Sequence, residues 1–249
     1  MPAESPREIP APIAILPVLG IGEVTPGADL AAVIAAALAP ASPSGPALAD
    51  GDVVVVTQKI VSKAEGQLVA IDAEDPAAKE RLVESESVRI LRRRGELLIT
   101  ETRHGFICAN AGVDLSNVAE GQAALLPVDP DRSARRLRAD LGRLLGASVG
   151  VVVSDTFGRT WRRGVTDVAI GCAGVAAVLD LRGTHDSQGR ELVATEVCVA
   201  DEIAGAAELV MGKATGVPVA IVRGVPAAWL RDGSVEGEIV RRTGEDLFR

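Results

Sequence analysis

Val149–Gly164 reads VGVVVSDTFGRTWRRG, and this stretch decides the fold that we expect. It begins with β-branched apolar residues, which are typical of a buried strand. The apolar run stops at residues 154–156, Ser-Asp-Thr, where one acid and two hydroxyl groups come together. Ligands of open α/β sheets bind at the carboxyl ends of the strands. The stretch therefore predicts an α/β fold, with mixed sheets, whose binding site begins at these three residues.

A second stretch, Ala109–Val118 or ANAGVDLSNV, places Asp114 and Asn117 in a glycine-bearing loop. Oxygen ligands of this kind suit Mg²⁺ or Mn²⁺, and arginine side chains suit polyphosphate. Three arginines closely follow the acid of the first stretch: Arg159, Arg162 and Arg163. We expect the two stretches to meet over a metal ion and a nucleotide.

Each of these features also has a simpler interpretation. Ser154 and Asp155 would cap a following helix, and Asp114 would lie in an ordinary turn. The arginines would form a solvated loop. Asp201 and Glu202 begin a predicted helix, where acids favour the helix dipole whether or not they bind a metal ion. If one of this pair is a ligand, we prefer Glu202, but spacing alone does not decide between the interpretations.

Composition argues against several functional classes. A net charge of −8 over 249 residues argues against general nucleic-acid binding. With no Tyr, three Phe and two Trp, the chain has few aromatic side chains on which bases stack. Three widely spaced cysteines and two isolated histidines argue against a disulfide framework, a zinc site or a nucleophilic triad. No apolar run reaches 18 residues and the N-terminus is polar, so we expect a cytoplasmic protein without membrane contact.

Predicted strands and helices alternate along the chain, as in other α/β proteins. We expect residues 1–12 to be a disordered lead and residues 40–46 to be a linker rich in Pro and Ser. Some charged residues of Pro76–Arg94 fall at i,i+3 or i,i+4 spacing, which predicts a helix with a solvated face. Residues 191–199 alternate as expected of a strand, and residues 200–212 predict a helix.

Lysine is rare in this chain, with four Lys against 22 Arg. Lys59, Lys63 and Lys213 therefore stand out, either as compact charges for phosphate or as ordinary surface residues. Glu208–Ala214, ELVMGKA, lacks the earlier glycine and the Ser or Thr of a P-loop. A nucleotide would have to bind to a different arrangement.

Five long motifs resemble, in order, the coenzyme F420-0 gamma-glutamyl ligase family, and together they cover nearly the whole chain from Ile13. The motifs are LPVLGIGEV (16–24), DGDVVVVTQKIVSKAEG (50–66), HGFICANAGVDLSNV (104–118), SDTFGRTWRRGVTDVAIG (154–171) and ELVATEVCVADEIAGAAELVMGKATGVPVAIVRG (191–224). The resemblance implies a GTP-dependent ligase that joins L-glutamate to the lactyl carboxylate of F420-0 and adds further gamma-linked glutamates. It also implies two Mn²⁺ or Mg²⁺ ions, K⁺, and an intertwined homodimer of subunits that each have two subdomains within residues 13–249.

The resemblance also assigns roles to individual residues. Asp114 and Asp155 would hold one metal ion, and Thr156 and Glu202 would hold the other. Apart from the resemblance, we expect Arg159 to act in catalysis with the two aspartates, as a cation for the anionic substrates. Gln58 stands where the family has Ser in a T-S-K motif. The implied nucleotide contacts are Ile21, Gly22, Glu23, Val24, Gln58, Lys63, Asn117, Met211, Gly212, Lys213 and Ala214. The nitroreductase-like second domain of some relatives is absent, which implies a stand-alone or a truncated ligase.

Amide synthesis through an acyl phosphate needs cations and alignment of the reactants, rather than a protein nucleophile. The residues above agree with that requirement. Two other functions stay open, a metal-dependent phosphoryl or nucleotidyl transferase acting on another acid, and a nucleotide-binding domain that is inactive without a C-terminal partner. GTP turnover that requires both F420-0 and glutamate distinguishes the ligase from both.

Overall fold

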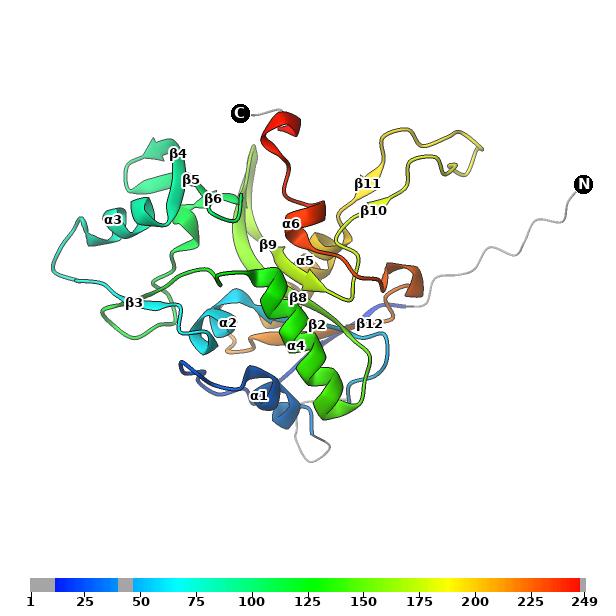
Figure 1. The fold of residues 1–249 in the computed structure, drawn as a ribbon, viewed down its shortest axis with the longest axis horizontal. Coiled ribbons are helices and arrows are strands. Elements are labelled where there is room, and N and C mark those ends of the chain that lie inside the picture. Colours follow the sequence, from blue (N-terminus) through cyan, green and yellow to red (C-terminus); the bar gives the residue numbers. More distant parts are fainter. Residues whose placement is uncertain (1–11, 40–46, 247–249) are drawn as a thin grey trace, which may run out of the picture.

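A five-stranded mixed sheet lies at the centre of the protein (Figure 1). The computed structural model describes residues 12–39 and 47–246, so the predicted lead, apart from residue 12, and the predicted linker lie outside these residues. The strand order is β1-β12-β2-β8-β9. The bounds are Ala14–Pro17 for β1, Val219–Arg223 for β12, Val53–Thr57 for β2, Gly150–Arg159 for β8 and Arg162–Ala173 for β9. The predicted mixed α/β class is confirmed.

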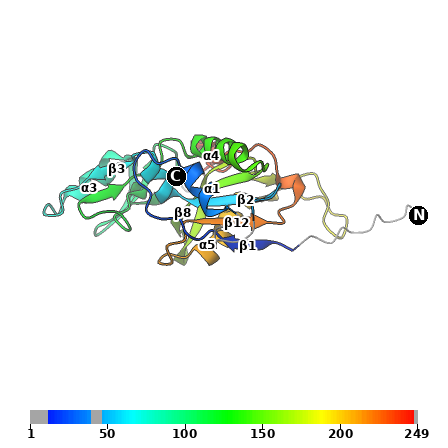
Figure 2. The ribbon, with the colours of Figure 1, turned by 90° about the horizontal axis from the view of Figure 1, so that it is seen from below.

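Helices cover both faces of this sheet (Figure 2). On one face α4 (Pro130–Leu145) packs on β8 and β9, with α1 (Leu30–Ala37) against it, and α5 (Val199–Met211) packs on the other face. Asp29 and Asp129 cap α1 and α4, because their carboxylates accept hydrogen bonds from backbone N–H groups three residues on. The buried valines of β2 and β8 form the middle of the main hydrophobic core.

One pair of neighbouring strands in the central sheet is parallel. The register of β2 and β8 runs from Val53 opposite Gly150 to Thr57 opposite Ser154, whereas the other pairs of this sheet are antiparallel. Helix α2 (Gln58–Ala64) begins directly after β2. The carboxyl end of β2 therefore lies beside Ser154, at the position where the sequence predicts a site.

The prediction that the Val149 strand stops at residues 154–156 is wrong. Strand β8 continues to Arg159 and returns as β9, with an irregularity in the register at Val153 and Ser154. The tip of this hairpin turns at Trp161, whose φ is 65°. Pairing with β9 supplies the backbone hydrogen bonds that let β8 extend beyond its parallel neighbour β2. The arginines of the first stretch thus lie at the end of a hairpin, not in an irregular loop.

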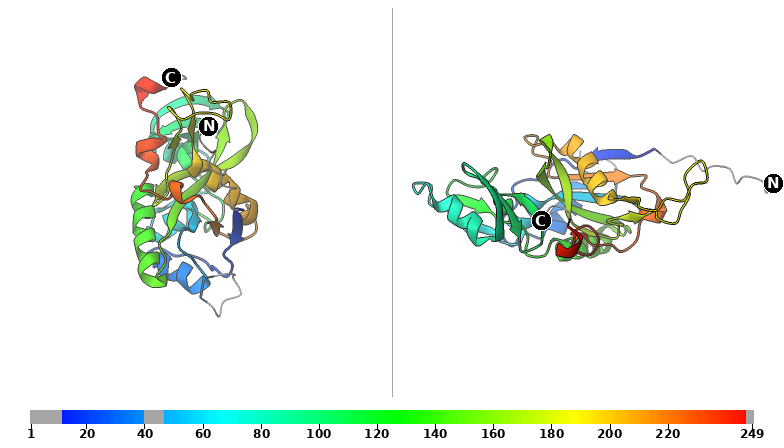
Figure 3. Two further views of the ribbon diagram at one scale, coloured as in Figure 1. Left: turned by 90° about the vertical axis from the view of Figure 1, so that its right-hand side faces the viewer. Right: turned by 90° about the horizontal axis from the view of Figure 1, so that it is seen from above.

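A second group of elements lies to one side of the central sheet (Figures 1 and 3). Its own hydrophobic cluster includes Val83, Leu98 and Ala123. Strands β4 (Ser87–Arg94), β5 (Leu97–Thr102) and β6 (Ile107–Ala109) form one sheet, and β3 (Leu68–Ala70) pairs with β7 (Gln122–Ala124). The group also contains α3 (Ala78–Ser85) and the 3-10 turn η1 (Asn110–Gly112).

The helix predicted over Pro76–Arg94 is wrong in its second half. Helix α3 ends at Ser85, and the arginine-rich remainder forms β4, which pairs with β5. Arg93 forms ion pairs with Glu80 and Glu84, so these charges join α3 to β4 rather than lying along one helix. Spacing between opposite charges does not distinguish the two arrangements.

The remaining elements include an arm that extends from the other side of the central sheet (Figures 1 and 3). Strands β10 (Leu179–Asp180) and β11 (Glu196–Val197) form an arm, so the strand predicted over 191–199 is only two residues long. The last elements are η2 (Ala227–Trp229), α6 (Val235–Glu238) and η3 (Thr243–Glu245). None of the helices within the described residues is both long enough and apolar enough to span a membrane.

Candidate functional site

A cavity of about 890 Å³ opens at the carboxyl end of β2, where the parallel pairing of β2 with β8 stops. Its lining comes from segments far apart in the sequence, including α2, the loop after η1 and the end of α5. A volume of this size suits a small-molecule site. The predicted site residues that line it are Ile21, Gly22, Glu23, Val24, Gln58, Lys63, Asp114, Asn117, Asp155, Thr156, Gly212, Lys213 and Ala214.

Three predicted site residues lie outside this cavity lining. The Met211 side chain is fully buried in the main core, and Glu202 is exposed in the first turn of α5. Arg159 is exposed on the hairpin, where its Nη2 atom donates to the Arg163 carbonyl at 3.0 Å. Helix α5 instead brings Glu208 to the cavity, near the C-terminal end of the helix.

The loop that carries Asp114 is held from both sides. Asn110 and Ala111 adopt left-handed φ angles of 51° and 52°, and the Asn110 side chain accepts a hydrogen bond from the Leu98 N–H at 3.0 Å. The Asp114 backbone exchanges two hydrogen bonds with Ala124, at 3.0 and 2.8 Å. These contacts fix where the Asp114 carboxylate enters the cavity.

Lys59 from α2 pairs with this carboxylate. Its Nζ atom lies 2.8 Å from Oδ2 of Asp114, and it also donates to the Ser116 hydroxyl at 2.8 Å. The Ser116 N–H donates to the other carboxylate oxygen at 2.7 Å. Although burial opposes the charged form, these hydrogen bonds lower the pKa of Asp114 below its usual value. Asp114 is therefore ionised at neutral pH.

Asp155 has the opposite electrostatic environment. Burial raises the pKa of its carboxyl group to about 7, and the charges of Asp167 and Asp114 add to the increase. The hydrogen bond from the Thr156 N–H, at 2.8 Å, opposes the shift without cancelling it. This crowding of carboxylates would be relieved by a cation.

Asp167, on β9, contacts three polar side chains in the cavity. Its carboxylate accepts hydrogen bonds from the Ser154 hydroxyl at 2.9 Å and the Thr156 hydroxyl at 2.5 Å, and Lys213 Nζ lies 3.3 Å away. Sequence reasoning did not single out Asp167 or Glu208. Asp167 could have been found from the sequence only by predicting the hairpin of β8 and β9, because the antiparallel register of these strands places Thr156 opposite Asp167.

Two of the predicted nucleotide contacts form an ion pair with each other. Lys63 Nζ lies 2.5 Å from Oε1 of Glu23, and the lysine side chain is almost fully buried. Gln58 lines the cavity, but its amide nitrogen donates inward to the Ser62 hydroxyl and the Leu125 carbonyl, both at 3.0 Å. The Gln58 amide nitrogen is thus engaged within the protein. Of Gln58 and Lys63, only Lys63 carries a charge that can attract an anion.

The donor set of the cavity fits a divalent cation. Carboxylate and hydroxyl oxygens from Asp114, Asp155 and Thr156 are ligands that Mg²⁺ and Mn²⁺ prefer. Over residues 12–39 and 47–246, no group of three or more His, Cys, Asp or Glu side chains has the geometry to hold a metal ion. Mg²⁺ typically binds to one or two carboxylates together with substrate phosphates. The cavity therefore suits an ion that arrives with a polyphosphate.

Comparison with known proteins identifies the relatives of this chain. The sequence profile of F420-0:Gamma-glutamyl ligase matches residues 19–224. The chain belongs to the F420-0:gamma-glutamyl ligase family. It is 41% identical to coenzyme F420:L-glutamate ligase of Methanothermobacter thermautotrophicus over 95% of this chain and 99% of that protein. It is 43% identical to the protein of the same name from Methanopyrus kandleri, over 91% and 94%.

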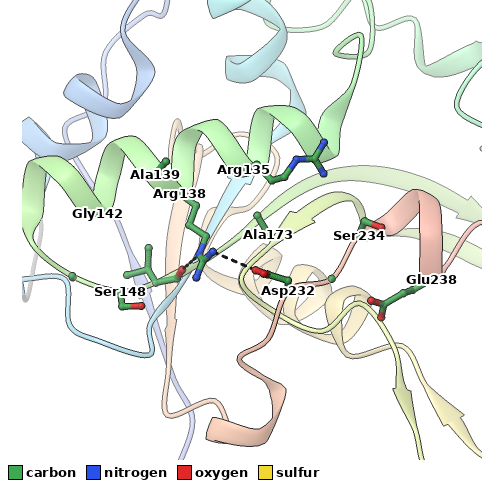
Figure 4. A pocket seen from close by; sticks show the side chains of 12 residues that line it. Arg135, Arg138, Ala139, Gly142, Ser148, Ala173, Asp232, Ser234 and Glu238 are labelled. Carbon is green, nitrogen blue, oxygen red and sulfur yellow. Dashed lines mark hydrogen bonds and ion pairs between the residues drawn. The ribbon is translucent and has the colours of Figure 1, made fainter.

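This family member has a second cavity, of about 770 Å³, beside Val149 at the opposite end of β8 (Figure 4). Arg138 crosses it, donating to the Val149 carbonyl at 2.8 Å and approaching Asp232 at 3.4 Å. None of the predicted site residues line it. The cavity at Asp155, which most of the predicted site residues line, is therefore the stronger candidate for the site of this ligase-family protein.

The cysteines of this family member are poor nucleophiles. Burial raises the pKa of each thiol to about 12, and negative neighbours add to the effect, so the thiolate is scarce at neutral pH. The three residues are Cys108, Cys172 and Cys198. The chemistry of the site must therefore come from its charged and oxygen-bearing groups.

Proposed function

We propose that this protein is a GTP-dependent ligase that forms an amide bond between L-glutamate and coenzyme F420-0. The observation that carries the proposal is the convergence of Asp114, Asp155 and Thr156 with Lys59 and Lys213 at one cavity. Acidic oxygens beside lysines suit a metal-bound nucleoside triphosphate. Membership in a family whose relatives are called coenzyme F420:L-glutamate ligase supports the choice of acid and amine.

The reaction has two balanced steps. The F420-0 carboxylate attacks the γ-phosphorus of GTP, which breaks the bond to the β-phosphate oxygen and gives an acyl phosphate and GDP. The glutamate amine then attacks the acyl carbon, phosphate leaves, and the amine loses a proton as the amide forms. Further gamma-linked glutamates would be added by the same two steps. Neither step needs a covalent bond to the protein, in agreement with the high thiol pKa values.

Each cavity residue has a role in this scheme. Asp114 and Asp155 would hold one divalent ion, and Thr156 would hold a second, with Glu208 as the acid from α5 in place of the earlier candidate Glu202. When bound, Mn²⁺ or Mg²⁺ would neutralise charge on the phosphates. The cavity lysines Lys59, Lys63 and Lys213, together with the loop at residues 21–24 and Asn117, would orient the nucleotide.

Three further expectations belong to this proposal. K⁺ would assist the reaction, and the active protein would be an intertwined homodimer. The two hydrophobic clusters agree with two subdomains in each subunit. Gel filtration with light scattering tests the dimer, and replacement of K⁺ by Na⁺ in the assay tests the ion.

The hairpin arginines are proposed to attract the anionic substrates, which an acidic protein would otherwise repel. Within the described residues, no carboxylate forms an ion pair with Arg159, Arg162 or Arg163, so their charge is available. Arg162→Ala should raise the KM for F420-0 or glutamate severalfold. Arg136→Ala, which removes an exposed arginine from α4, is the control. Unchanged kinetics of Arg162→Ala would remove that residue from the site.

Product masses test the proposed function directly. Protein is incubated with F420-0, L-glutamate, GTP and Mn²⁺, and we expect F420 to gain mass in glutamate steps while GDP and phosphate form in equal amounts. GTP turnover with another acid, without F420-0, would instead favour a phosphoryl or nucleotidyl transferase. GTP binding without GDP release, with both substrates present, would favour a binding domain that needs a partner.

A further inference from the structure

We propose that Asp167 is a positioning residue that fixes the Thr156 hydroxyl as an acceptor facing the metal ion. The inference rests on the proposed function, in which Thr156 contacts a divalent cation. It adds a residue that does not itself touch the ion and that connects this ligand to the Lys213 charge.

The contacts around Asp167 give each carboxylate oxygen a specific task. Oδ1 accepts the Thr156 hydroxyl at 2.5 Å and lies 3.3 Å from Lys213 Nζ, while Oδ2 accepts the Ser154 hydroxyl at 2.9 Å. Only 2% of Asp167 is exposed, and Asp167 lines the cavity together with Thr156 and Lys213. Both oxygens of this buried carboxylate are thus already engaged by side chains of the same cavity wall.

Hydrogen-bond chemistry then sets the character of the Thr156 oxygen. A hydroxyl group has one proton to donate and two lone pairs. An ionised carboxylate can only accept hydrogen bonds, so the Thr156 hydroxyl donates its hydrogen to Asp167. The lone pairs of the Thr156 oxygen then remain available to a cation. Groups behind a ligand that orient it in this way usually account for a tenfold to hundredfold difference in metal affinity.

A purely structural role does not account for the arrangement. Strands β8 and β9 are already joined by backbone pairing on both sides of Thr156 and Asp167. Burying a carboxylate is costly unless it is paired and hydrogen-bonded, and here the compensating partners are two hydroxyls and a lysine of the same cavity. The position of the charge is therefore explained by what it does to those groups.

A double-mutant cycle tests the inference. Mn²⁺ affinity is measured by electron paramagnetic resonance, with a non-hydrolysable GTP analogue present, for wild type, Asp167→Asn, Thr156→Val and the double variant. We expect Asp167→Asn to weaken Mn²⁺ binding about tenfold to hundredfold. In the Thr156→Val background the same change should have little further effect, because the hydroxyl that Asp167 orients is gone.

Other outcomes separate the two levels of the proposal. If Asp167→Asn weakens Mn²⁺ binding equally in both backgrounds, Asp167 acts through its charge alone and the positioning role is wrong. If Thr156→Val leaves Mn²⁺ affinity unchanged, the metal role of Thr156 in the proposed function fails first. Asp201→Asn is the matched control, because Asp201 accepts a hydrogen bond from the β9 backbone at 2.9 Å but lies outside the cavity lining. Thermal unfolding of each variant checks that it folds.

Discussion

The Nζ atom of Lys59 lies 2.8 Å from Oδ2 of Asp114, so a lysine neutralises a carboxylate that we propose for a metal ion. Both side chains are partly shielded from solvent. A divalent cation that binds Asp114 must share this oxygen with Lys59 or displace the lysine towards the bound phosphates. In the metal-free protein, Lys59 therefore competes with the cation for the Asp114 carboxylate.

Lys59→Met should strengthen Mn²⁺ binding in the absence of nucleotide. An ion pair of this exposure contributes about 0.2–1 kcal/mol, so we expect Mn²⁺ affinity to rise by up to about fivefold. Isothermal titration with MnCl₂ measures the change. Lys79→Met, in α3 and away from the cavity lining, is the control. Weaker Mn²⁺ binding by Lys59→Met would contradict the competition.

The two glutamates of α5, Glu202 and Glu208, should differ sharply in their effect on activity. Glu208 lines the cavity and lies 3.7 Å from Lys213, whereas Glu202 is exposed almost two turns earlier in the helix. Glu208→Gln should lower Mn²⁺-dependent GDP formation at least tenfold, because second-ion binding loses a carboxylate. Glu202→Gln should stay within about twofold of wild type. The reverse order in a GDP-release assay would restore Glu202 as the ligand.

The stability of the metal-free protein should depend on Asp155 near neutral pH. The folded pKa of this carboxyl is about 7, above its ordinary value of 3.8. Between about pH 4 and pH 7 the folded state retains a proton that the unfolded state has released. The contribution of Asp155 to stability is therefore greatest at acidic pH and falls as pH rises through this range.

Asp155→Asn removes this titration, so the variant should become more stable relative to wild type as pH rises from 5 to 8. Urea unfolding in EDTA at each pH gives the free energies. Glu120→Gln replaces an exposed carboxyl and should show no such trend. A constant difference between Asp155→Asn and wild type across this range would show that Asp155 does not titrate near neutrality.

Gly171→Ala should lower the free energy of unfolding by about 1–3 kcal/mol. A β-carbon at Gly171 in β9 would overlap the backbone of Pro130, where the first turn of α4 packs against the sheet. Gly158→Ala, in the same hairpin but with open space around it, should be close to neutral. Thermal unfolding compares the two, and equal melting temperatures would contradict this packing of α4.

Local sequence patterns predicted the elements that have strong local signals. The valine runs of β2 and β8 are strands, and Asp29 and Gly212 mark helix ends within a residue of those expected. The failure at Pro76–Arg94 has a physical cause: β4 is stabilised by pairing with β5 and by Arg93 contacts from α3. Such contacts are not encoded in the spacing of charges along one segment.

The sequence by itself determined the α/β class, the family, and most of the residues that line the cavity, because apolar runs and long motifs are properties of contiguous segments. Only the tertiary structure decided that Asp167 supports Thr156, that Lys59 pairs with Asp114, and that Glu208 rather than Glu202 faces the cavity. Each of these depends on strand register, helix rotation or the meeting of distant loops. Those relationships are set by packing of the whole chain, so no single segment contains them.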